Sequence, residues 1–284
     1  MPAQPVIALI AAGDMGSGVG ARLAEQGCMV LTSLAGRSAA SRARAEAAGM
    51  ADASDVELAA AGMILSIVPP GDALGLAERL APAMAVAASR PLYVDCNAVS
   101  PQTVRKIAAV VEAAGAPFVD AGIVGMAPRP GYTPVIYASG PGAVRFAELG
   151  AHGLDIRVMD GPVGQASALK MCYAGLTKGL HAVGVSVIRG AIEAGIEEPF
   201  LAELAASQPM LLDYFVRRTP GVFAKTYRWV AEMQEIGDFL GGPAEAIYDG
   251  AAALFDDMAS DHAGSRSEEA ELLAFLGRGR PSNR

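Results

Sequence analysis

The chain has 284 residues, of which 52% are hydrophobic and 18% are charged, and its formal net charge is −8. This length predicts two domains with a large buried core, and the acidic balance argues against a nucleic-acid surface. The first residues, Met1 to Gln4, lack the basic region of a signal peptide. Because Cys28, Cys96 and Cys172 show no metal-ligand spacing, we expect free thiols in the cytoplasm and no metal site.

A glycine turn follows the first predicted strand. The apolar run Val6–Ile10 leads into the turn Ala11–Gly16, where a helical pattern begins. At such a turn the backbone N–H groups of a helix N-terminus can meet a pyrophosphate. Gly13 would allow close approach to the phosphates, and Gly16 would allow the helix to pack on the strand. Although Ala11 replaces the first glycine of the usual G-x-G-x-x-G pattern, the position after a strand predicts a dinucleotide site. The cofactor contacts predicted here are Gly13, Asp14, Met15 and Gly16.

The second predicted strand ends without the acidic residue that is typical of NAD sites. Residues 28–44 contain no Asp or Glu, but they include Ser33 and Arg37 in the expected loop. An arginine beside hydroxyl groups suits the 2′-phosphate of NADP. We therefore predict that Ser33 and Arg37 bind NADP(H), whereas Arg42 and Arg44 are expected on a solvated helix face.

Short apolar runs alternate with alanine-rich helical segments as far as about residue 160, which is the pattern of a parallel sheet with crossover helices. The predicted strands are Val6–Ile10, Met29–Ser33, Met63–Val68, Leu92–Cys96, Phe118–Ala121, Val135–Ala138 and Ile156–Met159. The predicted helices are Gly18–Gln26, Ala39–Ala48, Ala73–Ala81 and Pro101–Ala114.

No strand pattern recurs after about Gln165. A helical pattern runs to Ala194, and the charged residues within it argue against a membrane span. Helical patterns continue to Leu276, before a polar tail, Gly277–Arg284, that we expect to be disordered. The predicted fold class is α/β, with an N-terminal Rossmann domain over residues 1–163, a long interdomain helix and an all-helical C-terminal domain over residues 164–284.

One lysine stands out at the start of the long helical pattern. Lys170 follows the glycine turn Gly161–Gly164, in a chain with only four lysines against eighteen arginines. A lysine in apolar surroundings can exchange a proton near neutral pH. The alternative is a lysine whose stem packs while its ammonium group reaches water, and the residue taken alone favours this alternative.

Together these segments resemble the β-hydroxyacid dehydrogenase superfamily, which includes 3-hydroxyisobutyrate and 6-phosphogluconate dehydrogenases. The spacing agrees over most of the chain. The similar segments are Ile10–Leu23, Val68–Pro69, Asp95–Pro101, Asp120–Met126, Gly161–Lys170 and Ala194–Ile196.

The resemblance implies roles for particular residues. Lys170 matches the lysine that acts as the family's catalytic acid/base. Val68 and Pro69 match a strand end that contacts the cofactor, and Asn97 lies in the segment lining the nicotinamide, where it would position nicotinamide or substrate. The segment Val124–Met126 matches the substrate loop, so Val124, Gly125 and Met126 are expected to face the substrate.

The chain departs from the family pattern at three places. Val124 replaces the loop serine, and Ala174, with Tyr173 beside it, replaces the asparagine one turn after the lysine. The family's later Lys-Asp pair has no clear counterpart, and the nearest segment, Trp229–Ile236, resembles a branch with an uncharacterised helical C-terminal domain. Cofactor use and the lysine carry over, but substrate identity does not. Tyr173 is a further candidate substrate contact.

The expected activity is reversible hydride transfer between NADP(H) and a secondary alcohol or ketone, with Lys170 exchanging the proton. An imine reductase is an alternative, favoured by the apolar substrate loop and opposed by the retained lysine. A non-catalytic NADP(H)-binding sensor is the other alternative. We expect a small-molecule substrate, no nucleic-acid or membrane partner, and a homodimer formed through the C-terminal domain. Arg129 and Lys178 could bind an anionic substrate only by reaching inward, and His181 is expected to be a packed or dimer-interface residue and not a catalytic one.

Overall fold

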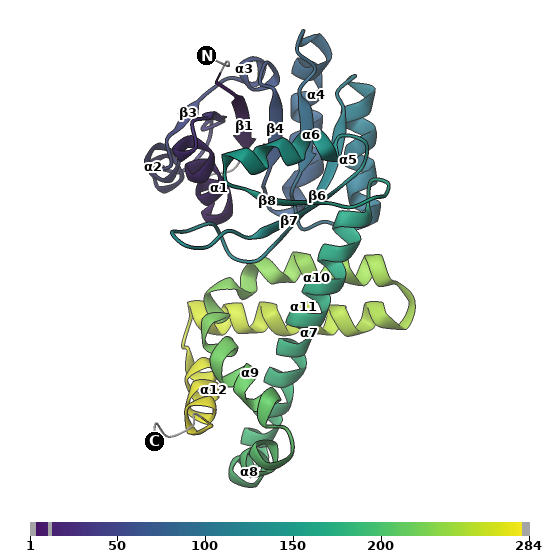
Figure 1. Ribbon diagram of the computed structural model, residues 1–284. Helices are drawn as coiled ribbons and strands as arrows, with labels where there is room; N and C mark the ends of the chain where they lie inside the picture. The colour runs from purple at the N-terminus through teal and green to yellow at the C-terminus, as the bar shows by residue number, and fades with distance from the viewer. Residues whose placement is uncertain (1–3, 11–12, 280–284) are drawn as a thin grey trace. The chain divides into compact units, whose positions relative to one another are not determined.

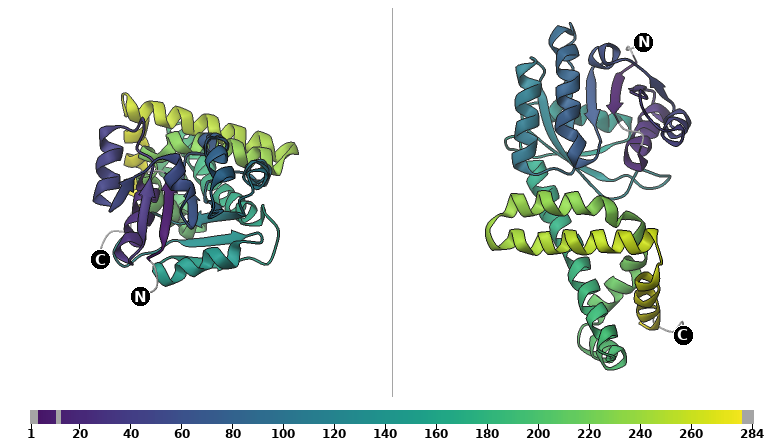
Figure 2. Two further views of the ribbon diagram at one scale, coloured as in Figure 1. Left: turned by 90° about the horizontal axis from the view of Figure 1, so that it is seen from above. Right: turned by 180° about the vertical axis from the view of Figure 1, so that it is seen from behind.

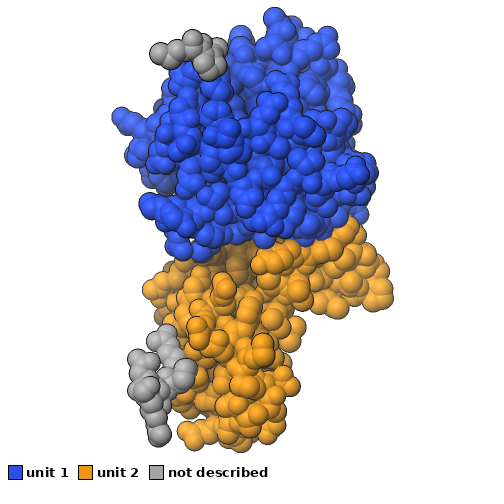
Figure 3. All heavy atoms as spheres, viewed as in Figure 1, with its two compact units in different colours: residues 1–171 blue, residues 172–284 orange. Residues whose placement is uncertain are grey.

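The computed structural model describes residues 4–10 and 13–279. The chain forms two compact units, Met1–Met171 and Cys172–Arg284, which are shown in different colours in Figure 3. The sequence predicted a boundary between residues 163 and 164, and the division between the units falls within the long helix α7 (Gln165–Glu193). The first turns of α7 belong to the first unit because they pack on its sheet.

The first unit contains an eight-stranded sheet in the order β3-β2-β1-β4-β5-β6-β7-β8 (Figure 1). Its order from β3 to β6 is that of a doubly wound dinucleotide-binding sheet. All neighbouring strands are parallel except β6 and β7. The strands are β1 (Val6–Ile10), β2 (Met29–Thr32), β3 (Met50–Asp52), β4 (Met63–Ser66), β5 (Leu92–Asp95), β6 (Phe118–Val124), β7 (Val135–Ser139) and β8 (Asp155–Val158).

Helices cover both faces of this sheet. Side chains of α1, α2 and α6 pack with Ile7 and Leu9 on one face, and those of α3, α4 and α5 pack with Ala8 and Ile10 on the other. Because both faces are buried, the central strands are continuous apolar runs. The helices are α1 (Asp14–Glu25), α2 (Ala39–Ala47), α3 (Asp55–Ala59), α4 (Ala73–Val86), α5 (Pro101–Ala113) and α6 (Ala143–Ala147).

The predicted α/β class is confirmed, with one correction to the sheet. The sequence predicted parallel strands throughout, whereas β7 runs antiparallel to β6. The loop 125–134 between these strands contains no helix, and a parallel return needs a longer crossover connection. The elements β3, α3 and α6 were not predicted, because each is too short to show a periodic pattern.

The second unit is helical within the part of it that the structure describes. It contains the remainder of α7 and then α8 (Glu197–Ser207), α9 (Pro209–Arg218), α10 (Thr226–Leu240), α11 (Gly242–Ala263) and α12 (Ser267–Arg278). α10 and α11 lie side by side (Figure 1, Figure 2). The tail begins later than predicted, since α12 continues to Arg278, and residues 280–284 lie outside the described residues.

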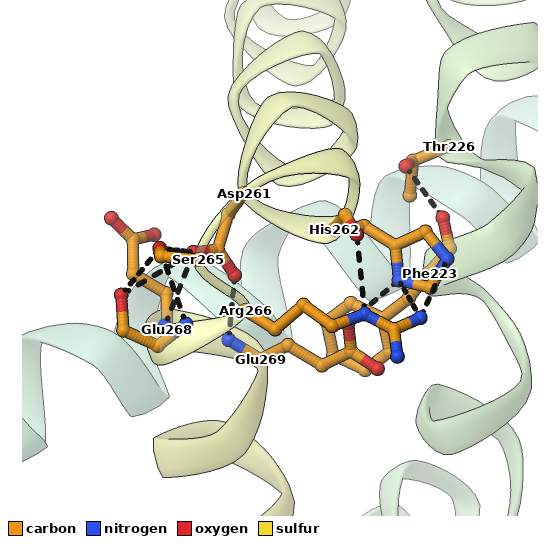
Figure 4. A network of polar contacts seen from close by, with 9 residues as sticks. Phe223, Thr226, Asp261, His262, Ser265, Arg266, Glu268 and Glu269 are labelled. Carbon is orange, nitrogen blue, oxygen red and sulfur yellow. Dashed lines mark hydrogen bonds and ion pairs between the residues drawn. The ribbon is translucent and has the colours of Figure 1, made fainter.

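A polar network holds the turn between α11 and α12 (Figure 4). The carboxylate of Asp261 accepts hydrogen bonds from the backbone N–H of Glu269 at 2.9 Å and from the hydroxyl of Ser265 at 3.0 Å. The first of these bonds is the main cause that lowers the pKa of Asp261 below its ordinary value. His262 contacts the Glu269 carboxylate at 2.6 Å. The network satisfies backbone groups that the start of α12 would otherwise leave unpaired.

α7 is long and apolar enough to pass a length-and-composition criterion for crossing a membrane, with 44% of its most apolar window buried. The core helix of a folded domain meets the same criterion. Buried residues recur on this helix, among them Met171, Val185 and Ile188, and they pack inside the protein. By length and composition, α7 is therefore weak evidence for a membrane span.

Candidate cofactor and substrate site

Five adjacent parallel strands, in the order β2-β1-β4-β5-β6, end at the same edge of the sheet. In doubly wound sheets, ligands bind outside this carboxyl edge. The structure brings the predicted cofactor residues and the substrate loop of the first unit to this edge. They are Gly13–Gly16 after β1, Ser33 and Arg37 after β2, Val68 and Pro69 after β4, Asn97 after β5, and Val124–Met126 at the end of β6.

The N-terminus of α1 has the features of a phosphate site. Gly13 is its N-cap and provides no side chain to cap the first-turn N–H groups. Among the residues that the structure describes, a Cβ atom at Gly13 would have no neighbour within 4 Å, so that part of the chain leaves the space beside it open. Gly16, in the first turn of α1, is buried. Free N–H groups beside open space fit a pyrophosphate, and the site therefore fits the dinucleotide that the sequence implies. Ala11, the departure in the motif, lies outside the described residues.

In the loop after β2, Arg37 is exposed to solvent and Ser33 is buried. Arg37 forms no ion pair in the part of the chain that the structure describes. An acidic residue that the sequence analysis missed lies nearby, because Asp52 at the end of β3 accepts the N–H of Leu34 at 2.8 Å. Asp52 comes from outside the segment 28–44, and β3 was not predicted. One of its carboxylate oxygens is already used by the backbone.

Asn97 connects the ends of β4 and β5. Its side-chain oxygen accepts the N–H of Val68 at 2.6 Å, and its amide group donates to Ser66 at 2.8 Å and to Asp95 at 2.7 Å. Both amide hydrogens are therefore used inside the protein. The geometry favours a positioning role, in which Asn97 holds the loop that begins at Val68, over direct donation to a ligand.

Asp95 is fully buried beside this amide. Burial, reinforced by the charge of Asp120 on the neighbouring strand, raises the pKa of Asp95 to about 7, although hydrogen bonds from Asn97 oppose the shift. Burial also raises the pKa of the adjacent Cys96 thiol well above its ordinary value. The carboxyl group of Asp95 thus gains or loses its proton near neutral pH, close to the edge of the sheet where ligands bind.

This shift predicts a pH-dependent stability. The pKa of Asp95 is higher in the folded than in the unfolded chain. Its contribution to the free energy of unfolding is therefore complete below about pH 4 and is lost as the pH rises to about 7. Asp95→Asn should reduce the fall in unfolding free energy over that range by on the order of 2–4 kcal/mol. Urea unfolding of both proteins at several pH values measures this fall, with the exposed Asp14→Asn as control. Equal slopes for Asp95→Asn and the unmodified protein would contradict the assignment.

A second buried carboxylate, Asp120, anchors the start of α7. It accepts hydrogen bonds from the N–H groups of Gly164 at 2.8 Å and Ser167 at 3.1 Å, and from the hydroxyls of Ser167 at 2.7 Å and Ser139 at 3.0 Å. The Ser139 hydroxyl in turn accepts the N–H of Ala166 at 3.1 Å. A negative charge is favoured at a helix N-terminus. The sequence analysis had placed Asp120 only in a segment similar to the family's loop and did not predict this role.

Lys170 reaches from α7 to the end of β6. Its ammonium group donates to the carbonyl oxygen of Ile123 at 2.8 Å. The helix lies close to the strand, since a Cβ atom at Gly122 would be 2.9 Å from the Ala166 oxygen and 3.0 Å from the Lys170 Cβ. In the described part of the chain Lys170 makes no ion pair, so two ammonium hydrogens remain available. The lysine is half-buried, and it is not a residue whose ammonium group simply extends into solvent.

The predicted substrate loop begins where Lys170 is anchored. Gly125 has φ 132°, a backbone conformation that favours glycine, and a Cβ atom there would lie 2.2 Å from the Tyr132 hydroxyl. Met126 is 48% exposed and Arg129 is exposed, with its guanidinium 5.6 Å from the centre of the Tyr132 ring. Val124 is partly buried. The loop thus offers apolar side chains together with one phenol group.

Tyr173, Lys178 and His181 belong to the second unit. Tyr173 is 52% exposed, whereas Lys178 forms a largely buried ion pair with Glu232. His181 is buried between Tyr214 and Thr219, and burial lowers its pKa to about 4. It is therefore neutral and packed, and packing is one of the two roles that the sequence analysis left open for it. Among the described residues no cluster of three or more His, Cys, Asp or Glu side chains is arranged to hold a metal.

The strand order, the uncapped helix after a glycine turn and the carboxyl-edge loops define a dinucleotide-binding Rossmann domain. A family model for the NAD binding domain of 6-phosphogluconate dehydrogenase matches residues 6–147, and the chain belongs to this family of NAD(P)-dependent oxidoreductases. A domain of unknown function, DUF1932, matches residues 191–258. The predicted branch with an uncharacterised helical C-terminal domain is confirmed.

Several known proteins are similar over most of their length. An uncharacterized 28.5 kDa protein of Methanothermus fervidus is 30% identical over 179 residues, which are 63% of this chain and 67% of that protein. The solved structure of the conserved protein MTH1747, of unknown function and similar to 3-hydroxyacid dehydrogenases, is 30% identical with a TM-score of 0.69, covering 94% of this chain and 99% of that one. Mycobacterium tuberculosis 3-hydroxyisobutyrate dehydrogenase, at 19% identity and a TM-score of 0.67, covers 98% and 100% and shares the fold.

Proposed function

We propose that the protein is an NADP(H)-dependent oxidoreductase that interconverts a secondary alcohol and a ketone, with Lys170 as the acid/base. The observation that carries this proposal is the ammonium group of Lys170, held on the Ile123 carbonyl at the carboxyl edge, where the N-terminus of α1 also lies. In reduction, the ammonium group would donate a proton to the carbonyl oxygen, and in oxidation neutral Lys170 would accept it. A bound nicotinamide supplies or accepts the hydride.

The remaining residues would bind and orient. Gly13, Asp14, Met15 and Gly16 would offer backbone N–H groups to the pyrophosphate, and Val68 and Pro69 would contact the cofactor beside them. Asn97 would hold that loop, and Val124, Gly125 and Met126 would face the substrate. Because Val124 supplies no donor where a carboxylate would be gripped, we propose a substrate less anionic than a sugar acid.

We expect a preference for NADP(H) over NAD(H), because Arg37 and Ser33 follow β2 where an acid would bind ribose. Arg37→Ala should erase roughly tenfold to a hundredfold of this preference, the effect of losing a bidentate phosphate contact. Fluorescence titration with both cofactors measures it, and Arg42→Ala is the matched control. Equal affinities for the two cofactors in the unmodified protein would refute the assignment. In that case the next residue to substitute would be Asp52, the acidic residue beside the loop after β2.

An imine reductase is the second candidate. The imine reductase from Myxococcus stipitatus in complex with NADP⁺ has the same fold at 17% identity, with a TM-score of 0.51 over 96% of this chain and 100% of that one. The apolar Val124 in the substrate loop favours an imine reductase, and the lysine at position 170 opposes it. NADPH oxidation with matched cyclic ketones and cyclic imines decides between them. A protein that binds NADPH and turns over neither class would instead be a sensor.

We further propose a cytoplasmic homodimer formed through α7. The part of α7 in the second unit exposes large apolar side chains at spacings of three, seven and four residues, namely Tyr173, Leu176, Val183 and Val187, which are 52%, 72%, 57% and 51% exposed. Such a face is typical of a surface that another helix covers. The reducing cytoplasm suits Cys172, an exposed free thiol.

Two charges on this face of α7 should prevent dimerisation. Leu176→Glu with Val183→Glu should shift sedimentation from dimer to monomer at micromolar concentration, because buried unpaired carboxylates oppose association. The same double change at the exposed positions Val56 and Val144 of the first unit is the control. A monomeric unmodified protein would contradict the proposal.

A further inference from the structure

The loop after β4 lies where the strand order of the sheet reverses. β1 and β4 are neighbours in the sheet, with β2 on the other side of β1, and ligands bind at such a point of reversal. The loop stays beside β1, because the N–H of Ile67 donates to the carbonyl oxygen of Ile10 at 3.1 Å. The two residues that follow Val68 are prolines, which have no N–H. This stretch of the loop is therefore anchored through the N–H of Val68, which donates to the side chain of Asn97.

The Asn97 side chain can hold Val68 in only one orientation of its amide group. Its oxygen accepts the Val68 N–H at 2.6 Å, so its NH₂ group points the opposite way. That group donates to a carboxylate oxygen of Asp95 at 2.7 Å and to the Ser66 hydroxyl at 2.8 Å. The other oxygen of Asp95 accepts the backbone N–H of Asn97 at 3.1 Å. Both oxygens of Asp95 thus face N–H donors, which suits a charged carboxylate.

Protonation of Asp95 conflicts with this arrangement. The added hydrogen sits on an oxygen that already faces an N–H, so a donor replaces an acceptor. Rotating the Asn97 amide by half a turn would give that hydrogen an acceptor, but it would also bring the NH₂ group against the N–H of Val68. Ser66, Val68, Asp95 and Asn97 are all buried, so water cannot readily replace a lost bond. Only the charged form of Asp95 is therefore compatible with all the bonds that the Asn97 side chain makes.

The groups around Asp95 place this protonation near neutral pH. Burial and the charge of Asp120, which faces it in register from β6, raise the pKa of Asp95 to about 7. Its neighbour on β4 is a serine. Tyr93 and Cys96 lie near it on or beside β5, and because burial raises the pKa of both, neither is charged at this pH. The charged residues of α4 and α5, the helices that pack on Tyr93, are exposed. Within the part of the chain that the structure describes, Asp120 is therefore the charged group that acts on Asp95.

We propose that Asp95 is a positioning residue for the dinucleotide. Its charged form turns the Asn97 amide toward Val68 and so fixes the loop after β4, whereas its protonated form releases the loop. The affinity for the cofactor should therefore rise with pH through the neutral range. By linkage, cofactor binding should lower the pKa of Asp95 and release part of a proton. The dinucleotide site belongs to the family, so this role does not depend on the proposed substrate or on Lys170.

Calorimetric titration of the full chain with NAD⁺ between about pH 5.5 and pH 8 tests this role without turnover. NAD⁺ is the cleaner probe, because the 2′-phosphate of NADP⁺ itself ionises at about pH 6. We expect the affinity to rise by roughly fivefold or more and then to level off above the pKa of Asp95 in the free protein. Titrations in buffers of different ionisation enthalpy measure the proton that binding releases.

Two variants separate this pH effect from a loss of structure. Asp95→Asn stays neutral and presents an N–H where the charged form presents an acceptor. Its affinity should resemble that of the unmodified protein at the lowest pH and should not change with pH. Asn97→Ala keeps the carboxyl group but removes its link to Val68, so its profile should also be flat. Asp72→Asn, which removes an exposed carboxylate at the N-cap of α4, is the matched control and should keep the full profile. NADP⁺, titrated in parallel, should show the same differences between the variants.

Several other results would each overturn the proposal. An affinity for NAD⁺ that stays constant or falls as the pH rises would show that the charged form does not hold the loop. A pH profile that persists in Asp95→Asn would assign the change to another group. A profile that persists in Asn97→Ala would show that Asp95 does not act through the loop. Absence of binding of either dinucleotide at every pH would remove the site that Asp95 is proposed to position.

Discussion

Lys170→Met should lower turnover of the best ketone substrate by about 10²–10⁴-fold, the usual contribution of a general acid or base. The side chain keeps its length and its packing on Gly122 but loses the ammonium group that donates to Ile123. NADPH binding should stay nearly the same, because the group that is removed exchanges a proton and does not hold the cofactor. Single-turnover kinetics and fluorescence titration measure the two quantities separately.

The matched control is Lys106→Met, which removes an exposed lysine from α5 of the same unit. It should leave both turnover and cofactor binding within about twofold of the unmodified protein, as surface substitutions usually do. If Lys170→Met retained near-normal turnover while the chemical step limited the rate, the acid/base assignment would be wrong. An imine reductase that uses another proton donor would then be the better description.

The parts of the site that could be predicted are those whose signal lies within one short segment of the sequence. Gly13, Val68 and Asn97 each follow an apolar run, and the carboxyl ends of parallel strands meet at one edge, so their neighbourhood follows from strand order alone. The lysine was identified by its distance from a glycine turn. Such signals depend on spacing within one segment, which a single sequence displays.

The parts that could not be predicted depend on contacts between distant segments. Asp52 reaches the loop after β2 from a strand of three residues, which is too short to show periodicity. The Tyr132 hydroxyl meets Gly125 only because the β6–β7 connection folds back as a hairpin. Asn97 was expected to meet the cofactor, yet its hydrogen bonds to Ser66 and Asp95 arise from strand neighbours far apart in sequence. Pairings of this kind follow from tertiary packing.

Asp120→Ala should lower the unfolding free energy by about 3–5 kcal/mol, a large effect for one residue. It removes the acceptor of four hydrogen bonds, which Gly164, Ser139 and Ser167 donate in a buried place. Most of this loss of stability comes from the donor groups left without an acceptor, because water has little access to them. Urea unfolding of the full chain measures the change.

The control for this loss is Asp155→Ala, since Asp155 lies in the same sheet but its carboxylate is exposed and pairs with Arg157. That variant should change stability by less than about 1 kcal/mol. Asp120→Ala should also lower turnover, because the start of α7 positions Lys170 on β6, whereas Lys170→Met should lower turnover with little loss of stability. A stable Asp120→Ala protein with normal turnover would show that packing of α7 on Gly122, and not the buried carboxylate, fixes the lysine.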